Sequence, residues 1–253
     1  MRVHWCSRSR PTATPSSPTP RGGQFLTLRI PSERTGSVAR CYSLASSPFT
    51  DDLLKVTVKR TSTGYASNWL CDNVRTGDLI EVLPPAGGVF TPKDFDDDLL
   101  LFAGGSGITP VMSILKAALS EGSHEVVLFY ANRDESSVIF AGELRELAAA
   151  YAGRLTVLHW LESVQGVPTV AQLAALSAKL DGHRVFTCGP ALRTPGADRV
   201  RGNRPPPVQS SHRLPAGRPP RVAEQRPQIG AGLVSGVVES RPPFLYDAAA
   251  QPQ

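Results

Sequence analysis

The sequence predicts a small antiparallel β-barrel followed by an α/β domain built on a parallel sheet. Short alternating strands separated by turns fill residues 24–95, without a long helix. From residue 96 to residue 190, apolar strands alternate with amphipathic helices, which is typical of a parallel sheet with right-handed crossovers. The flanks, residues 1–23 and 191–253, are rich in Pro, Arg, Ser and Gly and lack apolar periodicity, so we expect disordered ends.

The positive charge of the 253-residue chain lies in these flanks. The formal net charge is +5, with +4 in residues 1–23, +5 in residues 191–253 and −4 in residues 24–190. The C-terminal flank offers only Phe244 and Tyr246 as stacking rings for single-stranded nucleic acid. We therefore expect no nucleic-acid partner, and we place the function in the acidic middle of the chain.

The first half contains four expected strands and one short helix. Residues 24–30 alternate with Leu26 on the buried side, and residues 40–44, 54–60 and 79–83 follow as further strands. A helix of one or two turns is expected within residues 67–73. In the third strand, the alternation points Leu54, Val56 and Val58 inward and Lys55, Thr57 and Lys59 outward.

The second half opens with a continuous apolar strand over residues 98–103, as a doubly covered parallel sheet requires. The next helix is expected to begin with Thr109 as N-cap and Pro110 in the first helical position, and to end at Gly122. Strands are expected at 126–130, 155–161 and 184–187, and helices at 142–151 and 169–180.

Gly105-Ser106-Gly107-Ile108-Thr109-Pro110 lies between the first of these strands and its helix. Missing side chains let a pyrophosphate approach the backbone, and free N–H groups at a helix start bind its charge. A glycine turn alone can also be a tight turn without a ligand. Its position after the first strand of an α/β unit favours dinucleotide binding.

Two further segments follow strands of the same sheet. Arg133 could meet a ribose 2′-phosphate, whereas Asp134 or Glu135 could accept from a ribose hydroxyl, so this segment leaves NADH and NADPH open. Solvated charges are an equally good interpretation of each. Cys188-Gly189-Pro190 ends the last strand, and although such a cysteine is often a packed small apolar residue, Gly-Pro is expected to turn the thiol toward the ligand crevice.

In the first half, Arg40-Cys41-Tyr42-Ser43 combines a guanidinium, an aromatic ring and a hydroxyl on one strand. These groups could bind phosphate, stack on a flat ring and hydrogen-bond to it. An ordinary cross-strand Arg–Tyr pair is the alternative.

Taken together, these motifs resemble the ferredoxin–NADP reductase superfamily. Arg40-x-Tyr42-Ser43, Gly64-Tyr65-Ala66-Ser67-Asn68-Trp69-Leu70, the glycine turn and Cys188-Gly189-Pro190 occur in the order found there. Within it, residues 39–48, 69–90 and 100–115 are similar to the reductase components of Rieske-type oxygenases, nearest to those serving 3-ketosteroid 9α-hydroxylases.

The resemblance implies a site residue by residue. Arg40 would hold the FAD pyrophosphate, Tyr42 would stack on the isoalloxazine, and Ser43 would act beside flavin N5. Cys188 would lie beside nicotinamide C4, so Ser43 and Cys188 are the expected catalytic residues. The other cofactor contacts would come from Val58, Lys59, Gly64, Ala66, Ser67, Gly105, Gly107, Thr109, Arg133, Gly189 and Pro190.

The sequence departs from this subgroup at both flanks. Related reductases carry a plant-type [2Fe–2S] domain, but no cysteine follows Cys188 and none of the four cysteines has metal-ligand spacing, so we expect no metal site. The opening strand before residue 24 is also missing. We hypothesise that both flanks are read out of frame from a GC-rich gene, because composition changes abruptly near residue 192.

The expected function is hydride transfer from NADH or NADPH to FAD, in the reductase component of an oxygenase electron-transfer chain. NADH is favoured by the resemblance alone. The alternative is a non-catalytic remnant of such a reductase, with an incomplete nucleotide domain that retains flavin weakly. The few cysteines and the lack of a secretory signal predict a cytoplasmic protein. The uncharged run of residues 99–115 reads as strand, turn and helix, so no membrane span is expected.

Overall fold

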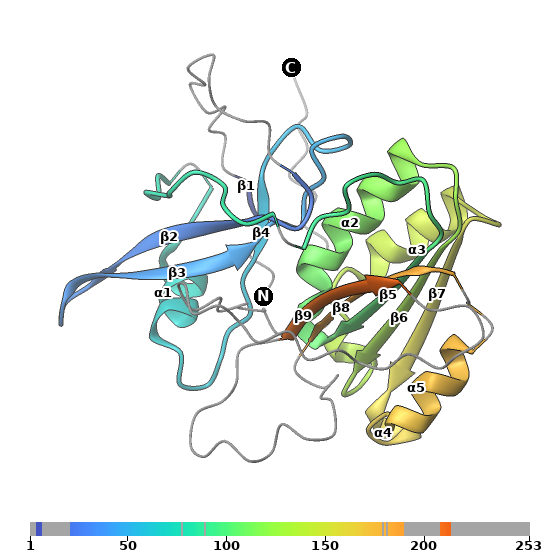
Figure 1. Cartoon of the computed structure of the whole chain (residues 1–253). Coiled ribbons are helices and arrows are strands. Elements are labelled where there is room, and N and C mark those ends of the chain that lie inside the picture. Colours follow the sequence, from blue (N-terminus) through green and yellow to red (C-terminus); the bar gives the residue numbers. More distant parts are fainter. Residues whose placement is uncertain are drawn as a thin grey trace, which may run out of the picture.

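The computed structural model describes residues 21–189, except residues 77, 89, 179 and 181, together with the backbone of two short strands in the flanks, β1 (His4–Cys6) and β9 (Val208–Arg213). Within it, residues 24–95 form a β module and residues 96–189 an α/β module (Figure 1). The predictions for the rest of residues 1–20 and 190–253, including Pro190, fall outside the described residues.

The β module is built on an antiparallel ribbon, β2 (Phe25–Ser32) and β3 (Gly36–Ser43), whose register pairs Leu26 with Tyr42. β4 (Lys55–Thr57) pairs with β1 and joins β3 through a bridge between Leu44 and Val56. The helix α1 (Tyr65–Asn73) packs beside this sheet. The antiparallel character predicted for the first half is thus confirmed.

Three strand predictions in this module need correction. β1 lies before residue 24, where the opening strand was expected to be missing, and it pairs with β4 in the antiparallel direction. The segment at 79–83 lies beside β2 through a bridge between Leu28 and Val82, but it forms no strand of its own, and Leu79 is 99% exposed. β4 is shorter than the predicted strand, and Thr57, expected to face outward, is 8% exposed. The consecutive side chains of Val56, Thr57 and Val58 are all buried, so the predicted alternation does not hold at the end of this three-residue strand.

The α/β module contains a sheet of order β7-β6-β5-β8-β9. Strands β5, β6, β7 and β8 run parallel to one another, as predicted. β9 pairs with β8 in the antiparallel direction. The parallel strands are β5 (Leu99–Gly104), β6 (Val126–Asn132), β7 (Leu155–Leu161) and β8 (Arg184–Gly189).

Helices cover both faces of this sheet. α2 (Ile108–Glu121) and α3 (Ala141–Ala150) pack on one face, and α4 (Glu162–Gln165) and α5 (Val170–Ser177) lie on the other (Figure 1). Two short 3₁₀ turns, η1 (Gly105–Gly107) and η2 (Glu135–Ser137), follow β5 and β6. Thr169 is the N-cap of α5, and its hydroxyl accepts from the Gln172 N–H at 3.3 Å.

The helix after the glycine turn starts earlier than predicted. α2 begins at Ile108 with Gly107 as N-cap, so Thr109 and Pro110 lie inside its first turn. The Thr109 hydroxyl therefore donates back to the Ser106 carbonyl at 3.1 Å instead of capping. A proline is tolerated here because the N–H groups of the first turn have no partner within the helix.

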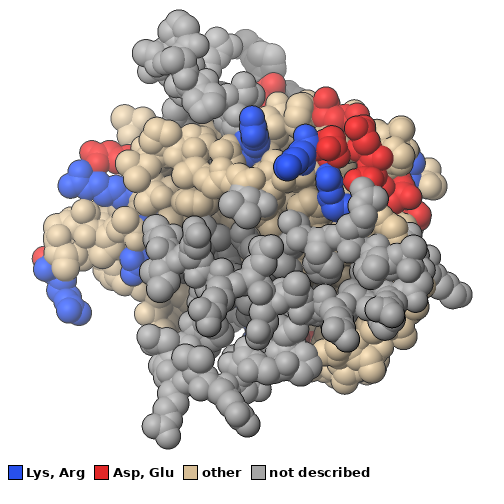
Figure 2. Space-filling view, viewed as in Figure 1, with Lys and Arg blue, Asp and Glu red and all other residues tan. Residues whose placement is uncertain are grey.

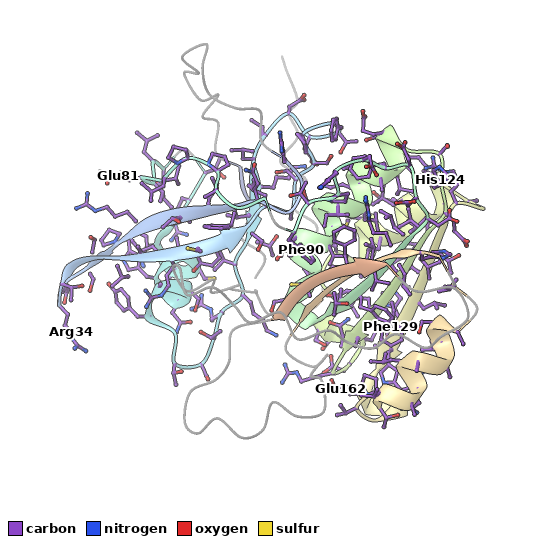
Figure 3. All side chains as sticks on the ribbon, viewed as in Figure 1. Arg34, Glu81, Phe90, His124, Phe129 and Glu162 are labelled. Carbon is purple, nitrogen blue, oxygen red and sulfur yellow. The ribbon has the colours of Figure 1, made fainter. Side chains whose placement is uncertain are left out.

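The core is shared across the junction of the two modules. Ala45 and Phe90 of the β module belong to the same buried cluster as Ile108, Phe186 and Cys188 of the α/β module. The Phe90 and Phe186 rings meet edge to face, 5.6 Å apart, and Figure 3 shows Phe90 between the two modules. The described middle of the chain carries its negative charge mainly on the α/β module, where acidic side chains gather on the face shown in Figure 2.

Candidate functional site

The predicted flavin residues lie at the end of β3, where the strand approaches the α/β module. Arg40 is half-buried, and its Nη1 donates to the Ala39 carbonyl at 2.8 Å. Within the described residues Arg40 has no carboxylate partner, so its charge is available to an anion. Ser43 ends the strand and is 5% exposed.

The Tyr42 side chain is buried more deeply than stacking on a flavin requires. Its side chain is 3% exposed and belongs to the core cluster of the β module with Leu26 and Leu28. Burial raises the pKa of the Tyr42 phenol to about 12, although the nearby Arg40 charge opposes this shift. Stacking on a flavin stays a prediction, and it requires one face of the ring to be uncovered when the flavin binds.

The start of α1 forms the second part of the predicted flavin site. Ser67 Oγ accepts the Thr61 N–H at 3.2 Å and donates to the Gly64 carbonyl at 3.2 Å. A Cβ on Gly64 would lie 1.9 Å from Thr61 Oγ1, so this close turn requires glycine. The N-cap position carries no side-chain cap, which leaves N–H groups of the first turn for a phosphate.

The other three predicted residues on this side differ in position. Val58 is 4% exposed and packs in the core cluster, so only its backbone could line a ribityl chain. Lys59 is half-buried and lies between β4 and α1 in the sequence. Ala66 is buried next to Ser67, which agrees with a backbone contact from this residue.

Sequence reasoning missed the arginine that supports this region. Arg60 reaches α1 with two hydrogen bonds to the Asp72 carboxylate, at 3.0 and 2.6 Å, and a third to Asn68 at 3.3 Å. The fork of a guanidinium matches a carboxylate in this way. The pair therefore connects the segment after β4, which carries Lys59, with the helix that carries Ser67. The only signal in the sequence was a basic residue twelve positions before an acidic one.

The glycine turn lies at the carboxyl ends of β5 and β8, as predicted. A Cβ on Gly107 would lie 1.9 Å from the Cys188 carbonyl oxygen and 2.7 Å from the Gly189 nitrogen. Only glycine allows this approach. The Tyr130 hydroxyl donates to the Gly105 carbonyl at 3.0 Å and accepts from the Ile139 N–H at 3.2 Å, which anchors the turn to β6. Tyr130 was not predicted as part of the site.

Cys188 contradicts one expectation. Its side chain is completely buried and lies in the shared core cluster, so the thiol does not open into the crevice. The strand continues through Gly189, and its side-chain alternation sends Cys188 to the same face as Phe186. A role beside the nicotinamide stays a prediction. What the structure establishes is that the backbone of Cys188 contacts the glycine turn.

After β6, Arg133 is exposed, while Asp134 caps η2. Asp134 Oδ1 accepts from the Ser136 hydroxyl at 2.7 Å and from the Ser137 N–H at 2.9 Å. The hydrogen bond from Ser136, helped by those from Ser137, holds the pKa of this carboxyl below its usual range. Asp134 therefore presents a fixed negative charge at the carboxyl edge of the sheet.

Asn132, next to these residues, has a buried side-chain amide that a ligand at this edge of the sheet could contact. It is 3% exposed, and neither its amide nitrogen nor its amide oxygen has a hydrogen-bond partner among the described residues. Buried amides without partners are rare unless a ligand or water completes them. Together with the glycine cradle at Gly107, this orphaned amide fits a dinucleotide at the carboxyl edge.

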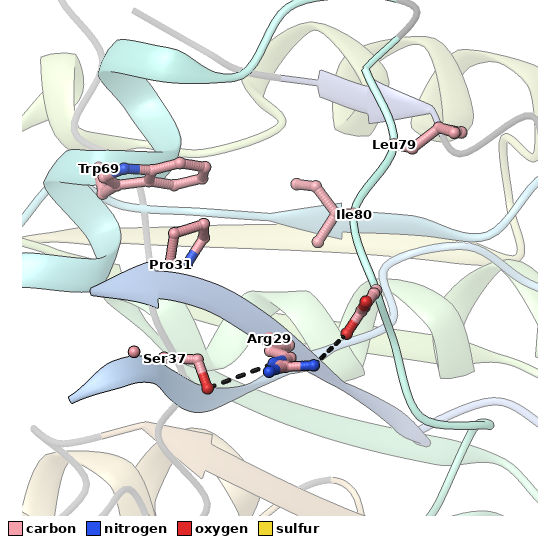
Figure 4. A pocket seen from close by; sticks show the side chains of 8 residues that line it. Arg29, Pro31, Ser37, Trp69, Leu79 and Ile80 are labelled. Carbon is pink, nitrogen blue, oxygen red and sulfur yellow. Dashed lines mark hydrogen bonds and ion pairs between the residues drawn. The ribbon is translucent and has the colours of Figure 1, made fainter. Parts of the chain in front are cut away.

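A pocket elsewhere shares no residue with this site. Figure 4 shows it on the β module, bounded by Trp69 and Ile80, with a volume of about 340 Å³. Arg29 crosses its floor in hydrogen bonds to Ser37 at 3.2 Å and Glu81 at 2.8 Å. The charged and hydroxyl groups of its lining, Arg29, Ser37 and Glu81, already bond to one another, and none of the predicted site residues lines it.

Comparison with known proteins agrees with this geometry. Residues 19–90 match the oxidoreductase FAD-binding domain, and residues 101–192 match the oxidoreductase NAD-binding domain. The chain therefore carries an oxidoreductase FAD-binding domain followed by an oxidoreductase NAD-binding domain. The two matches divide at the same place as the β module and the α/β module.

Among relatives of this chain, the ferredoxin reductase component of the 3-ketosteroid-9-alpha-monooxygenase of Rhodococcus rhodochrous is 68% identical over 190 residues, covering 72% of this chain and 54% of the relative. The component of the same name from Mycolicibacterium smegmatis is 66% identical over 180 residues, covering 71% and 51%. The chain thus spans about half the length of these relatives.

A solved structure supports the fold. The cytochrome P450 reductase of Amycolatopsis superposes with a TM-score of 0.52 at 26% identity, over 64% of this chain and 50% of that one. In the described part of our structure, no helix is long and apolar enough to cross a membrane.

Proposed function

We propose that this oxidoreductase transfers a hydride from NADH to FAD and serves as the reductase component of a 3-ketosteroid 9α-monooxygenase, handing electrons to the oxygenase component. Residues 24–95 would bind FAD and residues 96–190 the nicotinamide dinucleotide. The names of relatives 66–68% identical support the partner and the substrate class of the whole system. A cytoplasmic location is part of the same proposal.

One observation carries the proposal: the shared core brings the end of the flavin strand to the end of the nucleotide strand. Ala45, two residues after Ser43, is buried in one cluster with Cys188, whose carbonyl lies against the glycine turn. A flavin held at β3 and a nicotinamide held at the carboxyl edge would therefore meet at this junction. Holding two reactants in such contact lowers the barrier to transfer.

On the side of the β module, a small set of residues would bind FAD. Arg40 and the N–H groups at the start of α1 would hold the FAD pyrophosphate, and the Ser67 hydroxyl would become a further donor by turning from the Gly64 carbonyl to the phosphate. Ser43 would hydrogen-bond near the flavin N5. When bound, FAD supplies the redox chemistry, because a flavin accepts a hydride and releases its electrons singly.

On the other side, the glycine turn and the first turn of α2 would bind the dinucleotide phosphates, with Gly105, Gly107 and Thr109 forming the cradle. The buried core around Ile108 and Cys188 would exclude water from the transfer site. No residue of the chain needs to accept a proton during the transfer itself.

Asp134 supports a preference for NADH. Its ionised, hydrogen-bonded carboxylate suits a ribose hydroxyl and repels a 2′-phosphate. Changing Asp134→Asn keeps the cap acceptor and removes the charge. We expect the ratio of kcat/KM for NADH to that for NADPH to fall by about tenfold. An unchanged ratio would assign the choice to other residues.

The test of the function is an absorbance spectrum of the purified full chain before and after anaerobic NADH. We expect the flavin bands of bound FAD, bleaching on NADH, and recovery on addition of ferricyanide. Colourless protein that takes up no added FAD would instead support the non-catalytic remnant. Flavin that stays oxidised under NADH would show an incomplete nucleotide site.

A further inference from the structure

A buried ion cluster crosses the junction between the modules. Lys116 of α2 has its side chain 7% exposed, and its Nζ lies 2.7 Å from Oδ2 of Asp51, whose side chain is also 7% exposed. Asp51 belongs to the loop after β3, in the β module. A second carboxylate, Glu143 of α3, lies 3.2 Å from the same Nζ, but within the α/β module.

The Asp51 carboxylate is fully engaged. Its Oδ2 accepts the Ser47 N–H at 2.8 Å as well as Lys116, and Oδ1 accepts from Lys55. Removal of two charges from water is costly unless each is paired and hydrogen-bonded, and here both are. The cluster of Lys116, Asp51 and Lys55 is therefore a rigid connection between the two modules, called the joint below. The ion pair between Arg29 and Glu81, in contrast, is exposed to water.

A second contact lies one turn away on the same helix. The Ser113 hydroxyl donates to the Ser46 carbonyl at 2.6 Å, and Ser113 is completely buried. Residues three apart on a helix share one face, so Ser113 and Lys116 attach the same side of α2 to the loop at 46–51. This helix begins at the glycine turn, and this loop begins just after Ser43.

We infer that Lys116 and Asp51 are positioning residues for hydride transfer: they fix the nucleotide-binding helix against the flavin-binding strand, and so set the alignment of the two cofactors. This inference rests on the proposed function. Neither side chain needs to touch a cofactor. An error of about 1 Å in the relative placement of reacting atoms can lower a rate about a hundredfold, so a joint that holds two separate binding sites in register has a direct effect on turnover.

The two carboxylates around Lys116 provide matched variants. Asp51→Asn removes the partner across the junction, and Glu143→Gln removes the partner inside one module. We expect the rate of anaerobic flavin reduction at saturating NADH to fall at least about tenfold in Asp51→Asn and less than about twofold in Glu143→Gln. The long-wavelength absorbance of stacked nicotinamide and flavin should weaken only in Asp51→Asn, while FAD content and KM for NADH stay near those of the parent. Equal effects of the two variants, or a loss explained by lost FAD, would overturn the inference.

Hydrogen–deuterium exchange tests the joint without turnover. In Asp51→Asn and in Lys116→Met, amides of residues 45–51 and of the first two turns of α2 should exchange faster, and Lys116→Arg should restore protection. Unchanged exchange would refute the joint, whether or not the chain holds flavin. If the parent chain fails to bleach with NADH but the exchange result holds, the proposed function fails and the joint stands. A Glu81→Gln variant, in an exposed ion pair far from the junction, serves as the folding control.

Discussion

At the scale of single residues, the site depends on how closely backbone segments approach. Gly107 lies against the Cys188 carbonyl with no room for a side chain, and Asp51 is surrounded by donors. Neither property is visible in the residue itself, because each depends on a partner about 65 to 80 positions away in the chain.

The first prediction concerns Gly107→Ala. Its Cβ would lie 1.9 Å from the Cys188 oxygen, so the turn must move away from β8. We expect the free energy of unfolding to fall by about 1–3 kcal/mol and NADH-dependent bleaching to be lost, while FAD remains bound. Urea unfolding and flavin absorbance measure these effects. Gly142→Ala, where an added Cβ meets no atom within 4 Å, should not lower the unfolding free energy and should leave bleaching unchanged.

The second prediction concerns acid stability. Burial alone would raise the pKa of Asp51, but hydrogen bonds from Lys116, Lys55 and Ser47 outweigh it and hold the pKa below its usual range. A carboxyl with a lowered folded-state pKa stabilises the fold above its unfolded-state pKa, near 4, and this contribution is lost as the pH falls through the folded-state value. As the pH falls from about 5 to about 2, the free energy of unfolding should decrease less steeply in Asp51→Asn than in the parent chain. Parallel curves would contradict this.

At the scale of elements, the sequence pattern was reliable where a segment carries its own periodicity. Leu155–Leu161 has the predicted bounds of β7, and α3 and α5 lie within a few residues of their predicted ranges. Predictions were wrong at the ends of elements. The start of α2 moved because η1 runs directly into the helix, and the segment at 79–83 stayed irregular because it pairs with β2 only through single bridges.

The third prediction belongs to the helix α1. Ser67→Ala removes a hydroxyl that accepts the Thr61 N–H before the helix and, on our proposal, turns from the Gly64 carbonyl to donate to the FAD pyrophosphate. A hydrogen bond to a charged group contributes about 1.5–3 kcal/mol, so FAD affinity should fall by about tenfold or more. Titration of the apoprotein with FAD measures it. Asn73→Ala, in the last turn of the same helix, removes only a bond to the Trp69 carbonyl and should leave FAD affinity unchanged.

At the scale of the whole molecule, two modules with different periodicities share one buried core. Phe90 packs on Phe186, and Lys116 pairs with Asp51, so the modules should unfold together. We expect one calorimetric transition, which FAD at a hundred times its Kd stabilises by about 2.7 kcal/mol. Two transitions, with only one shifted by FAD, would show that the junction contributes little to stability.

The sequence by itself determined the two modules, their order and the motif residues at the candidate site, because alternation, helical periodicity and glycine placement are local properties. It also led to the resemblance that named the cofactors. The tertiary structure decided which of those residues meet: it buried Cys188 and Tyr42, bound Arg60 to Asp72, and paired Lys116 with Asp51. Such contacts join residues distant in sequence, and their free energies depend on burial and geometry that no local pattern encodes.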